Sequence, residues 1–410
     1  MTEYNAIRME SYNNHKGYIF KLPNGLEVYV KNNILYLPKI FDIYKNNEYE
    51  KNVSQKNNNP RSINNIKPCG LFNIGGVCYM NAVLQCFFYC KPLTKYFLNL
   101  YNKNDLGPIS KGYFSFIKGL SSGNKEAAQK FKEIMIKSDE SFYGTDGNDS
   151  KDVAILILSE LHNELKPNKN NEKIKLDDRT TNNYDINDVY YVKNKLDKIN
   201  GNSTIISETF NYSIKVEQKC DKNCQKYNNS FYTIETDNIL LLDLDTLFPH
   251  DNISISIEDI LKSYTNFKKI DCPYCKKKSL YIGNKFCSLP KILVLVLSRG
   301  YHNRFKCKIE FNETLDMADY YEPVNKNDNI NTEYNLIGAT FVYDWSYEGT
   351  GHTVAFCKTY QDNNYYIFND RTCRKSKISE INGKMPYLLF YERNINEEYK
   401  HIFKYNYILK

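Results

Sequence analysis

The sequence predicts an α+β fold in which helices come first and a β-rich region follows them. Helical patterns dominate residues 67–165, whereas the residues from 204 onward form short runs rich in β-branched and aromatic side chains. The chain has 410 residues, of which 41% are hydrophobic and 25% are charged, so its composition is that of a globular protein with a large core. We find no internal repeats.

The first 66 residues are expected to form an extension that ends in an Asn-rich linker. The stretch GYIFKLPNGLEVYV, residues 17–30, places PNG between alternating apolar residues and predicts a hairpin. Residues 46–65, NNEYEKNVSQKNNNPRSINN, have almost nothing to bury and are typical of a linker.

Four helices are predicted in the mostly helical stretch 67–165. They cover residues 78 to about 90, 111–120, 125–140 and 149–165. Proline cannot continue a helix, so Pro92 is expected to stop the first of them. Cys86 and Cys90 lie well inside that helix, and we expect both of them in the core.

A polar insertion, residues 166–203, separates these helices from the strands, and we assign it no function. Strands are predicted within residues 204–220, 232–245, 279–286, 291–298, 334–344, 352–360, 363–370 and 386–393. The β-rich region is expected to span residues 204–397, with a tail at 398–410.

The charge pattern argues against nucleic acid and membranes as partners. The net charge of +7 is modest for this length, and the lysines are scattered among Asn, Asp and Glu instead of forming a basic stripe. No apolar run approaches 18 residues, and the amino terminus lacks the pattern of a signal peptide. The 12 cysteines are therefore expected to be reduced thiols, and the protein to be cytoplasmic, nuclear or both.

One cysteine stands at the start of the first predicted helix, in GLFNIGGVCYMNAVLQCFFYC, residues 70–90. Unpaired N–H groups and the helix dipole favour negative charge there, so Cys78 is a candidate nucleophile. Asn73 lies five residues upstream across a Gly-Gly turn, from where its carboxamide and the Cys78 N–H could donate to an oxyanion. The alternative is a cysteine that only packs in the core.

Among the six histidines, His352 is the best candidate for a general base. It follows EGTG and begins the strand pattern HTVAFCKTY, at the mouth of a loop on a rigid element, whereas His162 is expected to be a surface or half-buried residue. Asn369 and Asp370 return beside His352 at the end of NNYYIFND, and either could accept the Nδ1 proton. An ordinary strand-end turn is the alternative reading of these two residues.

Two close pairs of cysteines, each on a turn between strands, predict a zinc site. KCDKNC supplies Cys220 and Cys224, and DCPYC supplies Cys272 and Cys275. Four thiolates can hold a tetrahedral zinc ion with no open position, so the role of the metal would be structural. Reduced, metal-free thiols are the alternative.

The motifs together resemble those of the ubiquitin-specific proteases. GLFNIGGVCYMNAVLQ is similar to the cysteine box of that family, GTGHTVAF to its histidine box, and KILVLVLSR, after Leu289 and Pro290, to a core strand. YYIFND and PYLLFYER follow at the family's usual spacings, so the resemblance spans residues 68 to about 393. Three positions depart from the pattern: Gly76-Val77 replaces Asn-Thr, and Thr353 replaces an aromatic residue.

The resemblance implies a papain-like fold with a helical thumb at 67–165 and a palm and zinc-ribbon fingers at 204–397. It implies an enzyme that hydrolyses isopeptide, peptide or ester bonds after the C-terminal glycine of ubiquitin through an acyl-enzyme. The implied catalytic residues are Cys78 as nucleophile, His352 as base, Asn369 as the orienting residue, Asn73 as oxyanion donor and Asp370 as a substitute or second support for Asn369. Catalysis would need no cofactor, and the partners would be ubiquitin and ubiquitinated proteins, with a monomer expected and a regulatory partner left open.

Two acidic residues fall where the family binds ubiquitin's tail. Asp149 and Asp152 match the acids of Q-x-D-x-x-E, which engage arginines in that tail. The alternative is that both are acids favoured by the dipole in the first turn of a helix.

Two other functions remain open. One is a catalytically inactive ubiquitin-binding module of the same fold, which would have no reason to keep Cys78, His352, Asn369 and Asn73 together. The other is a protease for a ubiquitin-like modifier such as SUMO or NEDD8, against which only the two acids argue.

Overall fold

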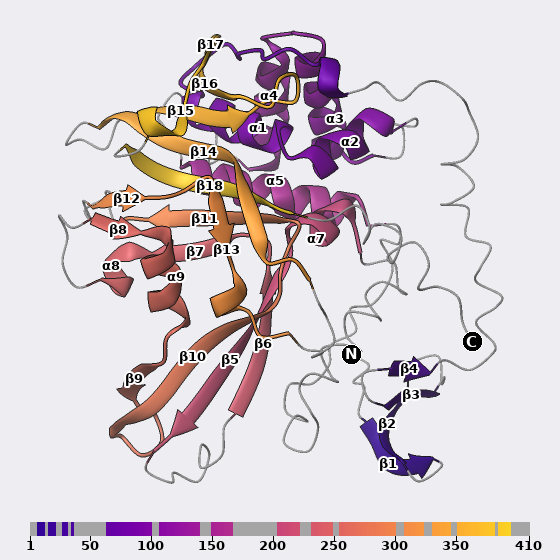
Figure 1. Ribbon diagram of the computed structural model, residues 1–410. Helices are drawn as coiled ribbons and strands as arrows, with labels where there is room; N and C mark the ends of the chain where they lie inside the picture. Colours follow the sequence, from indigo (N-terminus) through magenta and orange to yellow (C-terminus); the bar gives the residue numbers. More distant parts are fainter. Residues whose placement is uncertain are drawn as a thin grey trace.

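The computed structural model of the chain describes most of residues 63–394 and four strands that precede them (Figure 1). The described ranges are 6–12, 15–21, 27–31, 34–36, 63–100, 106–139, 149–166, 203–221, 231–248, 254–300, 307–323, 330–345, 351–381 and 384–394. Within these ranges, no helix combines the length and the apolar character that crossing a bilayer requires.

The four strands near the amino terminus form an antiparallel sheet of their own. They are β1 (Ala6–Tyr12), β2 (His15–Lys21), β3 (Glu27–Lys31) and β4 (Ile34–Tyr36), in the order β1-β2-β3-β4. Lys21 pairs with Glu27, as the predicted hairpin requires, although the PNG turn itself lies outside the described residues. Most of the predicted linker and the whole of 167–202 also lie outside them.

The helices of the first half of the chain gather at one end of the molecule, at the top of Figure 1. They are α1 (Cys78–Phe88), α2 (Lys91–Asn99), α3 (Pro108–Ser121), α4 (Ala127–Ser138) and α5 (Ser150–Glu164), with the short α7 (Ile205–Phe210) below. Helix α1 packs against β14, β15, β16 and α5 and is buried on all sides after its first residue. The prediction that Pro92 ends this helix was wrong: α1 ends at Phe88, and Pro92 lies in the first turn of α2, where its missing N–H costs nothing.

A sheet of eight strands forms the centre of the molecule. Its order is β17-β16-β15-β14-β18-β11-β7, with β13 paired to β14 off this path, and all of these pairs are antiparallel except β11 with β7. The strands are β7 (Leu240–Asp243), β11 (Ile292–Ser298), β13 (Thr314–Asp316), β14 (Glu333–Trp345), β15 (Gly351–Lys358), β16 (Tyr365–Asn369), β17 (Thr372–Lys375) and β18 (Met385–Arg393).

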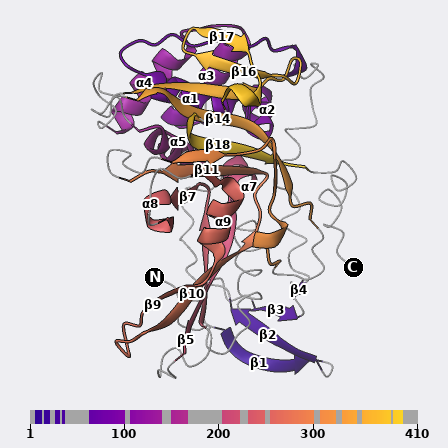
Figure 2. The same ribbon diagram turned by 60° about the vertical axis from the view of Figure 1, so that its left-hand side comes forward.

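A second sheet, with the order β6-β5-β10-β9, projects away from the helices (Figures 1 and 2). It consists of β5 (Tyr212–Cys220), β6 (Phe231–Asp237), β9 (Lys268–Asp271) and β10 (Lys278–Ser288). The pair β8 (Ser254–Ser256) and β12 (Lys308–Glu310) and the helices α8 (Leu244–Leu247) and α9 (Ile257–Thr265) lie beside the central sheet, at the left of Figure 1, and α9 also contacts β10. The far tip of β5 and β10 carries cysteines, as described below.

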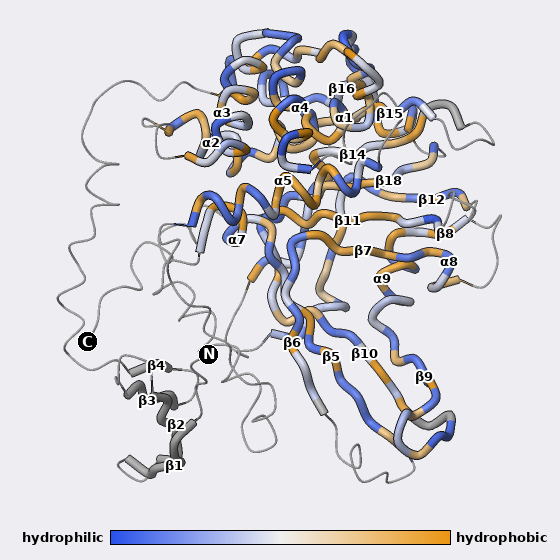
Figure 3. Tube along the Cα trace, turned by 180° about the vertical axis from the view of Figure 1, so that it is seen from behind, coloured by the Kyte–Doolittle hydropathy of each residue, from blue (hydrophilic) through white to orange (hydrophobic). Residues whose placement is uncertain are grey.

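The core consists of two large clusters that the central sheet separates. Alternate residues of β11 enter different clusters: Val294 and Val296 pack with the helices, whereas Leu293 and Leu295 pack on the other face. Figure 3 shows β11 as strongly hydrophobic and β9, at the free edge of the second sheet, as hydrophilic. A strand buried on both faces reads as a continuous apolar run, which is why KILVLVLS was recognisable in the sequence.

The α+β prediction is confirmed, with one element changed and others added. Residues 205–210, predicted as strand, form α7, because Thr204 and Ser207 make a capping box that starts a helix there. Helix α9 begins at a second capping box, Ser256 with Asp259, and was not predicted. The long mixed run after residue 232 divides into β6, β7 and α8.

Candidate active site

Cys78 is the first residue of α1. Val77 occupies the N-cap position, and its side chain makes no capping hydrogen bond. Cys78 is half-buried, whereas every later residue of the helix is buried. The core therefore holds the helix in place, while its first turn presents the thiol and backbone N–H groups at the edge of the core.

The Asn73 side chain connects the loop before α1 to the end of β16. Its Oδ1 accepts a hydrogen bond from the Val77 N–H at 2.7 Å, and its Nδ2 donates to Asp370 Oδ2 at 3.0 Å. Between Asn73 and Val77, Gly75 and Gly76 have φ angles of +76° and +69°. Asn tolerates positive φ better than other non-glycine residues, so the φ of Gly76 is one that the Asn of the motif can also adopt.

His352 lies at the start of β15, and its side chain is 33% exposed. Its Nε2 is 2.7 Å from Asn369 Oδ1, the end of β16. The expectation that the Nδ1 proton is given to Asn369 was wrong, because the nitrogen of the ring that faces the end of β16 is Nε2. An amide oxygen can only accept, so Nε2 carries the proton in neutral His352 and Nδ1 is the basic nitrogen.

Asp370 ties the end of β16 to the loop before α1. Its carboxylate accepts hydrogen bonds from Asn73 and from Asn81 Nδ2, the latter at 2.9 Å, and its Oδ2 is 3.7 Å from His352 Nε2. Its backbone carbonyl accepts from the Leu71 N–H at 2.8 Å. A Cβ on Gly70 would lie 2.4 Å from that carbonyl oxygen, so only glycine allows this close approach.

Asn81 is a site residue that the sequence analysis missed. It is buried on α1, one turn after Cys78, and its Nδ2 donates to both Phe72 O at 3.2 Å and Asp370 Oδ1 at 2.9 Å. The available signal was an amide at a buried helical position among apolar residues. A buried amide needs partners, and here the partners are the loop and the carboxylate that flank the thiol.

A narrow crevice lies between α1, which begins with Cys78, and the strands β15 and β16. It is lined by Cys78, Asn81, Ala82 and Gln85 from α1, by Thr353 from β15, and by Phe368 and Asp370 from β16 and its end. Deeper in the same interface, Cys86 Sγ of α1 is 3.8 Å from Cys357 Sγ of β15, and both residues are buried. The prediction that Cys86 and Cys90 lie in the core is confirmed, but Cys90 is the N-cap of α2 and does not lie inside α1. Cys78, His352, Asn369, Asn73 and Asp370 thus belong to one region, although 274 positions separate Cys78 from His352 in the chain.

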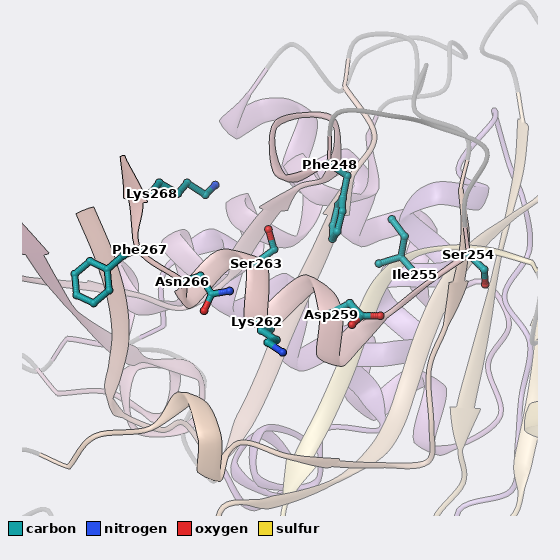
Figure 4. Close-up of a pocket in the computed structure, with 9 residues that line it drawn as sticks. All are labelled: Phe248, Ser254, Ile255, Asp259, Lys262, Ser263, Asn266, Phe267 and Lys268. Carbon is teal, nitrogen blue, oxygen red and sulfur yellow. The ribbon is translucent and has the colours of Figure 1, made fainter. Parts of the chain in front are cut away.

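A larger pocket lies elsewhere, and none of the predicted site residues lines it. Its volume is about 460 Å³, and Figure 4 shows its nine lining residues on α9 and the adjoining segments. They are Phe248, Ser254, Ile255, Asp259, Lys262, Ser263, Asn266, Phe267 and Lys268. These residues include no cysteine or histidine, so the pocket offers no counterpart to the groups around Cys78.

The two acids differ in how available they are. Asp149 is the N-cap of α5: its Oδ1 accepts from the Lys151 N–H at 2.8 Å, and its Oδ2 accepts from the Tyr387 hydroxyl at 2.6 Å. Asp152 has a side chain that is 57% exposed, and Lys151 lies 3.6 Å from it. Partial desolvation, with a smaller contribution from Asp149, raises the pKa of Asp152. Asp152 therefore presents a largely exposed carboxylate beside Lys151, whereas Asp149 is already used as a helix cap and as the acceptor of the Tyr387 hydroxyl.

Three of the four predicted zinc ligands lie together at the tip of the second sheet. The sulfur atoms of Cys220, Cys272 and Cys275 are all within 4.8 Å of one another, and Cys224 lies outside the described residues. Lys276, with a φ of +56°, turns the chain so that its N–H reaches Cys272 O at 2.9 Å. Three thiol ligands grouped around this turn fit zinc, and a fourth thiol from Cys224 would complete a tetrahedral site with no open position.

His162 has a structural role in α5. Its Nδ1 is 2.8 Å from Thr204 Oγ1, which accepts hydrogen bonds from Ile206 and Ser207 and so donates its own proton to the ring. Burial, with a smaller effect of Lys166, lowers the pKa of His162 to about 4. His250, His302 and His401 lie outside the described residues.

The comparisons with known proteins cover most of the chain. The model of the family described as ubiquitin carboxyl-terminal hydrolase matches residues 69–391. Ubiquitin carboxyl-terminal hydrolase 16 of Arabidopsis thaliana is 27% identical over 353 residues, which are 80% of this chain and 30% of that protein. Ubiquitin carboxyl-terminal hydrolase 2 of Bos taurus is 24% identical over 79% of this chain and 54% of its own length. The chain therefore spans about a third to a half of these relatives.

Solved structures give the same fold. One chain from the structure of the SAGA Ubp8/Sgf11/Sus1/Sgf73 DUB module bound to ubiquitin aldehyde superposes with a TM-score of 0.60. The match covers 90% of this chain and 81% of that one, at 19% sequence identity. At this identity the likeness shows the fold alone.

Proposed function

From the premise that this chain belongs to the ubiquitin carboxyl-terminal hydrolase family, as a ubiquitin-specific protease, we propose that it is a cysteine deubiquitinase with Cys78 as its nucleophile. The observation that carries the proposal is the hydrogen bond between His352 and Asn369, 2.7 Å long, beside the crevice that Cys78 lines. A thiol, a base and a group that orients the base are the minimum for nucleophilic catalysis by cysteine.

The first step would join the sulfur to the substrate. His352 Nδ1 takes the proton of Cys78, and the thiolate attacks the carbonyl carbon of ubiquitin's C-terminal glycine, whose electron pair moves onto its oxygen. Asn369 accepts from Nε2 throughout and so fixes the ring and its tautomer. Collapse of the intermediate expels the amine of the target lysine, which takes the proton back from His352.

The negative oxygen of the intermediate would be bound by two N–H donors. One is the Cys78 backbone N–H at the start of α1, and the other is the Nδ2 of Asn73, which has two hydrogens and gives one of them to Asp370. Donors that are already in place need no reorganisation when the charge develops. Asp370 then acts as a positioning residue for Asn73 and not as a replacement for Asn369.

The acyl-enzyme would be released by water. His352 Nδ1 removes a proton from a water molecule, the resulting hydroxide attacks the thioester carbon, and the Cys78 thiol is regenerated. The same two N–H donors serve this second tetrahedral intermediate.

Ubiquitin recognition would involve Asp152 and the projecting sheet. An exposed carboxylate at the start of α5 suits an arginine of ubiquitin's tail, and Asp149 supports the same turn through Tyr387. Zinc, held by Cys220, Cys224, Cys272 and Cys275, would make the tip of the second sheet (the fingertip) rigid and take no part in the reaction. The expected partners are ubiquitin and ubiquitinated proteins, in the cytoplasm, the nucleus or both.

The experiment is hydrolysis of a fluorogenic amide attached to the carboxy terminus of ubiquitin. Cys78→Ala is expected to lower turnover by more than about 10⁴-fold, because no other group replaces the nucleophile. Ubiquitin binding, measured by calorimetry, should persist, and Cys373→Ser, a change at a half-buried cysteine on β17, should leave turnover unchanged. Retained turnover in Cys78→Ala would exclude Cys78 as the nucleophile.

A further inference from the structure

The turn between the two oxyanion donors consists of two glycines in a row. Gly75 and Gly76, both with positive φ, connect Asn73 to the first residue of α1. Glycine has more conformational freedom than any other residue, so a pair of them does not by itself hold one conformation. Contacts from elsewhere in the fold must fix this turn if Asn73 and the Cys78 N–H are to keep their relative positions.

One such contact comes from α4, 57 positions further along the chain. Lys132 Nζ donates a hydrogen bond to the carbonyl oxygen of Gly75 at 3.0 Å. Phe131 and Met135 hold α4 in the core, so the base of the Lys132 side chain is fixed. Lys132 is itself half-buried, and desolvation lowers its pKa. Hydrogen bonds from a charged donor are stronger than those between neutral groups.

The geometry of the peptide unit links this contact to the site. In a trans peptide the C=O of one residue and the N–H of the next point in opposite directions. Fixing the Gly75 carbonyl toward Lys132 therefore fixes the Gly76 N–H on the other side, and rotation of this peptide unit would break the bond to Lys132. The Val77 N–H to Asn73 bond, 2.7 Å long, closes the turn at its other end.

We propose that Lys132 is a positioning residue that holds the Gly75-Gly76 turn so that Asn73 and the Cys78 N–H stay aligned for the oxyanion. It acts through its hydrogen bond to the Gly75 carbonyl. The inference rests on the proposed function, since it assigns Lys132 a part in the same reaction.

Lys132→Met tests the proposal, with Lys130→Met as the matched control. Methionine keeps most of the apolar side chain and removes the charge and the donor, and Lys130 is an exposed lysine of the same helix. With the ubiquitin amide substrate, Lys132→Met is expected to lower kcat about tenfold at an unchanged KM, because alignment in the transition state is lost while ubiquitin binding is kept. Lys130→Met should leave both constants unchanged.

A second change provides a rescue. Gly76→Asn keeps the positive φ but leaves the turn fewer alternative conformations. If Lys132 acts by restraining the turn, Gly76→Asn in the Lys132→Met background should recover a large part of kcat. A lysine that contributes only to the stability of α4 would not be compensated by a change in the turn.

Amide hydrogen exchange supplies a readout that does not depend on activity. In Lys132→Met, exchange should increase in the segment 74–78 and stay unchanged in the body of α4. Equal kcat values for the two methionine variants, or faster exchange throughout α4, would overturn the role of Lys132. A wild-type protein without turnover would instead overturn the proposed function, so the two failures are distinguishable.

Discussion

The region around Cys78 and the tip of the second sheet are organised in opposite ways. Around Cys78, polar side chains are paired with one another by direct hydrogen bonds, and a large cluster of buried residues from α1, β15 and β16 supports them. Among the described residues of the fingertip, the buried cluster consists of Cys220, Cys272 and Leu280, with two partly buried neighbours. The thiols there lie close together, and the described part of the tip places little core behind them.

The difference indicates what each region needs in order to form. The hydrogen bonds around Cys78 need nothing beyond the chain, so the site is expected to be assembled before substrate arrives. The described residues of the fingertip bury little apolar area around the three thiols, so its geometry is expected to depend on a metal. Removing one polar partner should therefore act on chemistry in the first region and on local structure in the second.

Apart from replacement of Cys78 itself, the largest effect is expected from Asn73→Ala. Loss of one oxyanion donor costs on the order of 10²-fold in kcat, and here the change also removes a partner of Asp370. Steady-state kinetics with the ubiquitin amide measure this loss, and Asn163→Ala, at an exposed position of α5, is the control. A loss of only about twofold would mean that Asn73 is merely structural and that the region is not preassembled for an oxyanion.

A metal measurement tests the fingertip. Protein purified without added metal should contain about one zinc ion per chain, and Cys272→Ser should contain none. Because the ligands are far from the crevice, this change should raise KM for ubiquitin substrates more than it lowers kcat. Cys373→Ser, outside the cluster, should keep its zinc. Full zinc content in Cys272→Ser would remove that residue from the ligand set.

Acidification should lower the free energy of unfolding through His162 of α5, which lies in neither of the two regions. Its folded pKa of about 4 lies below the unfolded value of 6.5, so the unfolded chain binds more protons in acid. The contribution of neutral His162 to the free energy of unfolding is fully present above pH 6.5 and is lost as the pH falls through about 4. Partial exposure of the ring limits this contribution to about 2 kcal/mol or less. Urea unfolding of the wild type and of His162→Gln measures it. Parallel pH profiles for the two proteins would contradict this account.

The smallest effect is expected from Val77→Thr at the uncapped start of α1. A threonine hydroxyl at this position can accept a hydrogen bond from an N–H group of the first turn of α1. At the observed backbone angles we expect this to raise the free energy of unfolding by about 0.5 kcal/mol. Thermal unfolding should show a slightly higher Tm. A decrease in Tm would mean that a buried hydroxyl at this position finds no partner.

Much of the site could be predicted because its signals are local. The start of α1 at Cys78, the strand that begins near His352 and the apolar run of β11 each follow from short stretches of sequence. Asn369 was likewise placed near His352, because two consecutive strands return to the same edge of the sheet.

The rest depends on contacts between distant segments. Asn81 and Asp370 are 289 positions apart, and no local pattern indicates that one donates to the other. The same holds for Lys132 and Gly75, and for the ring orientation that gives Nε2 of His352 to Asn369. Helix α7 was missed because its β-branched residues favour a strand, whereas the Thr204 capping box and burial of Phe210 determine the outcome.

The most direct test of the central claim uses ubiquitin with an electrophile at its carboxy terminus, with SUMO and NEDD8 probes in parallel. We predict that the wild-type chain gains the mass of one ubiquitin on Cys78, that Cys78→Ala gains none, and that His352→Ala reacts far more slowly. Labelling of a different residue, or equally fast labelling without His352, would contradict the assignment of this pair. Preferential reaction with SUMO or NEDD8 would contradict ubiquitin as the substrate.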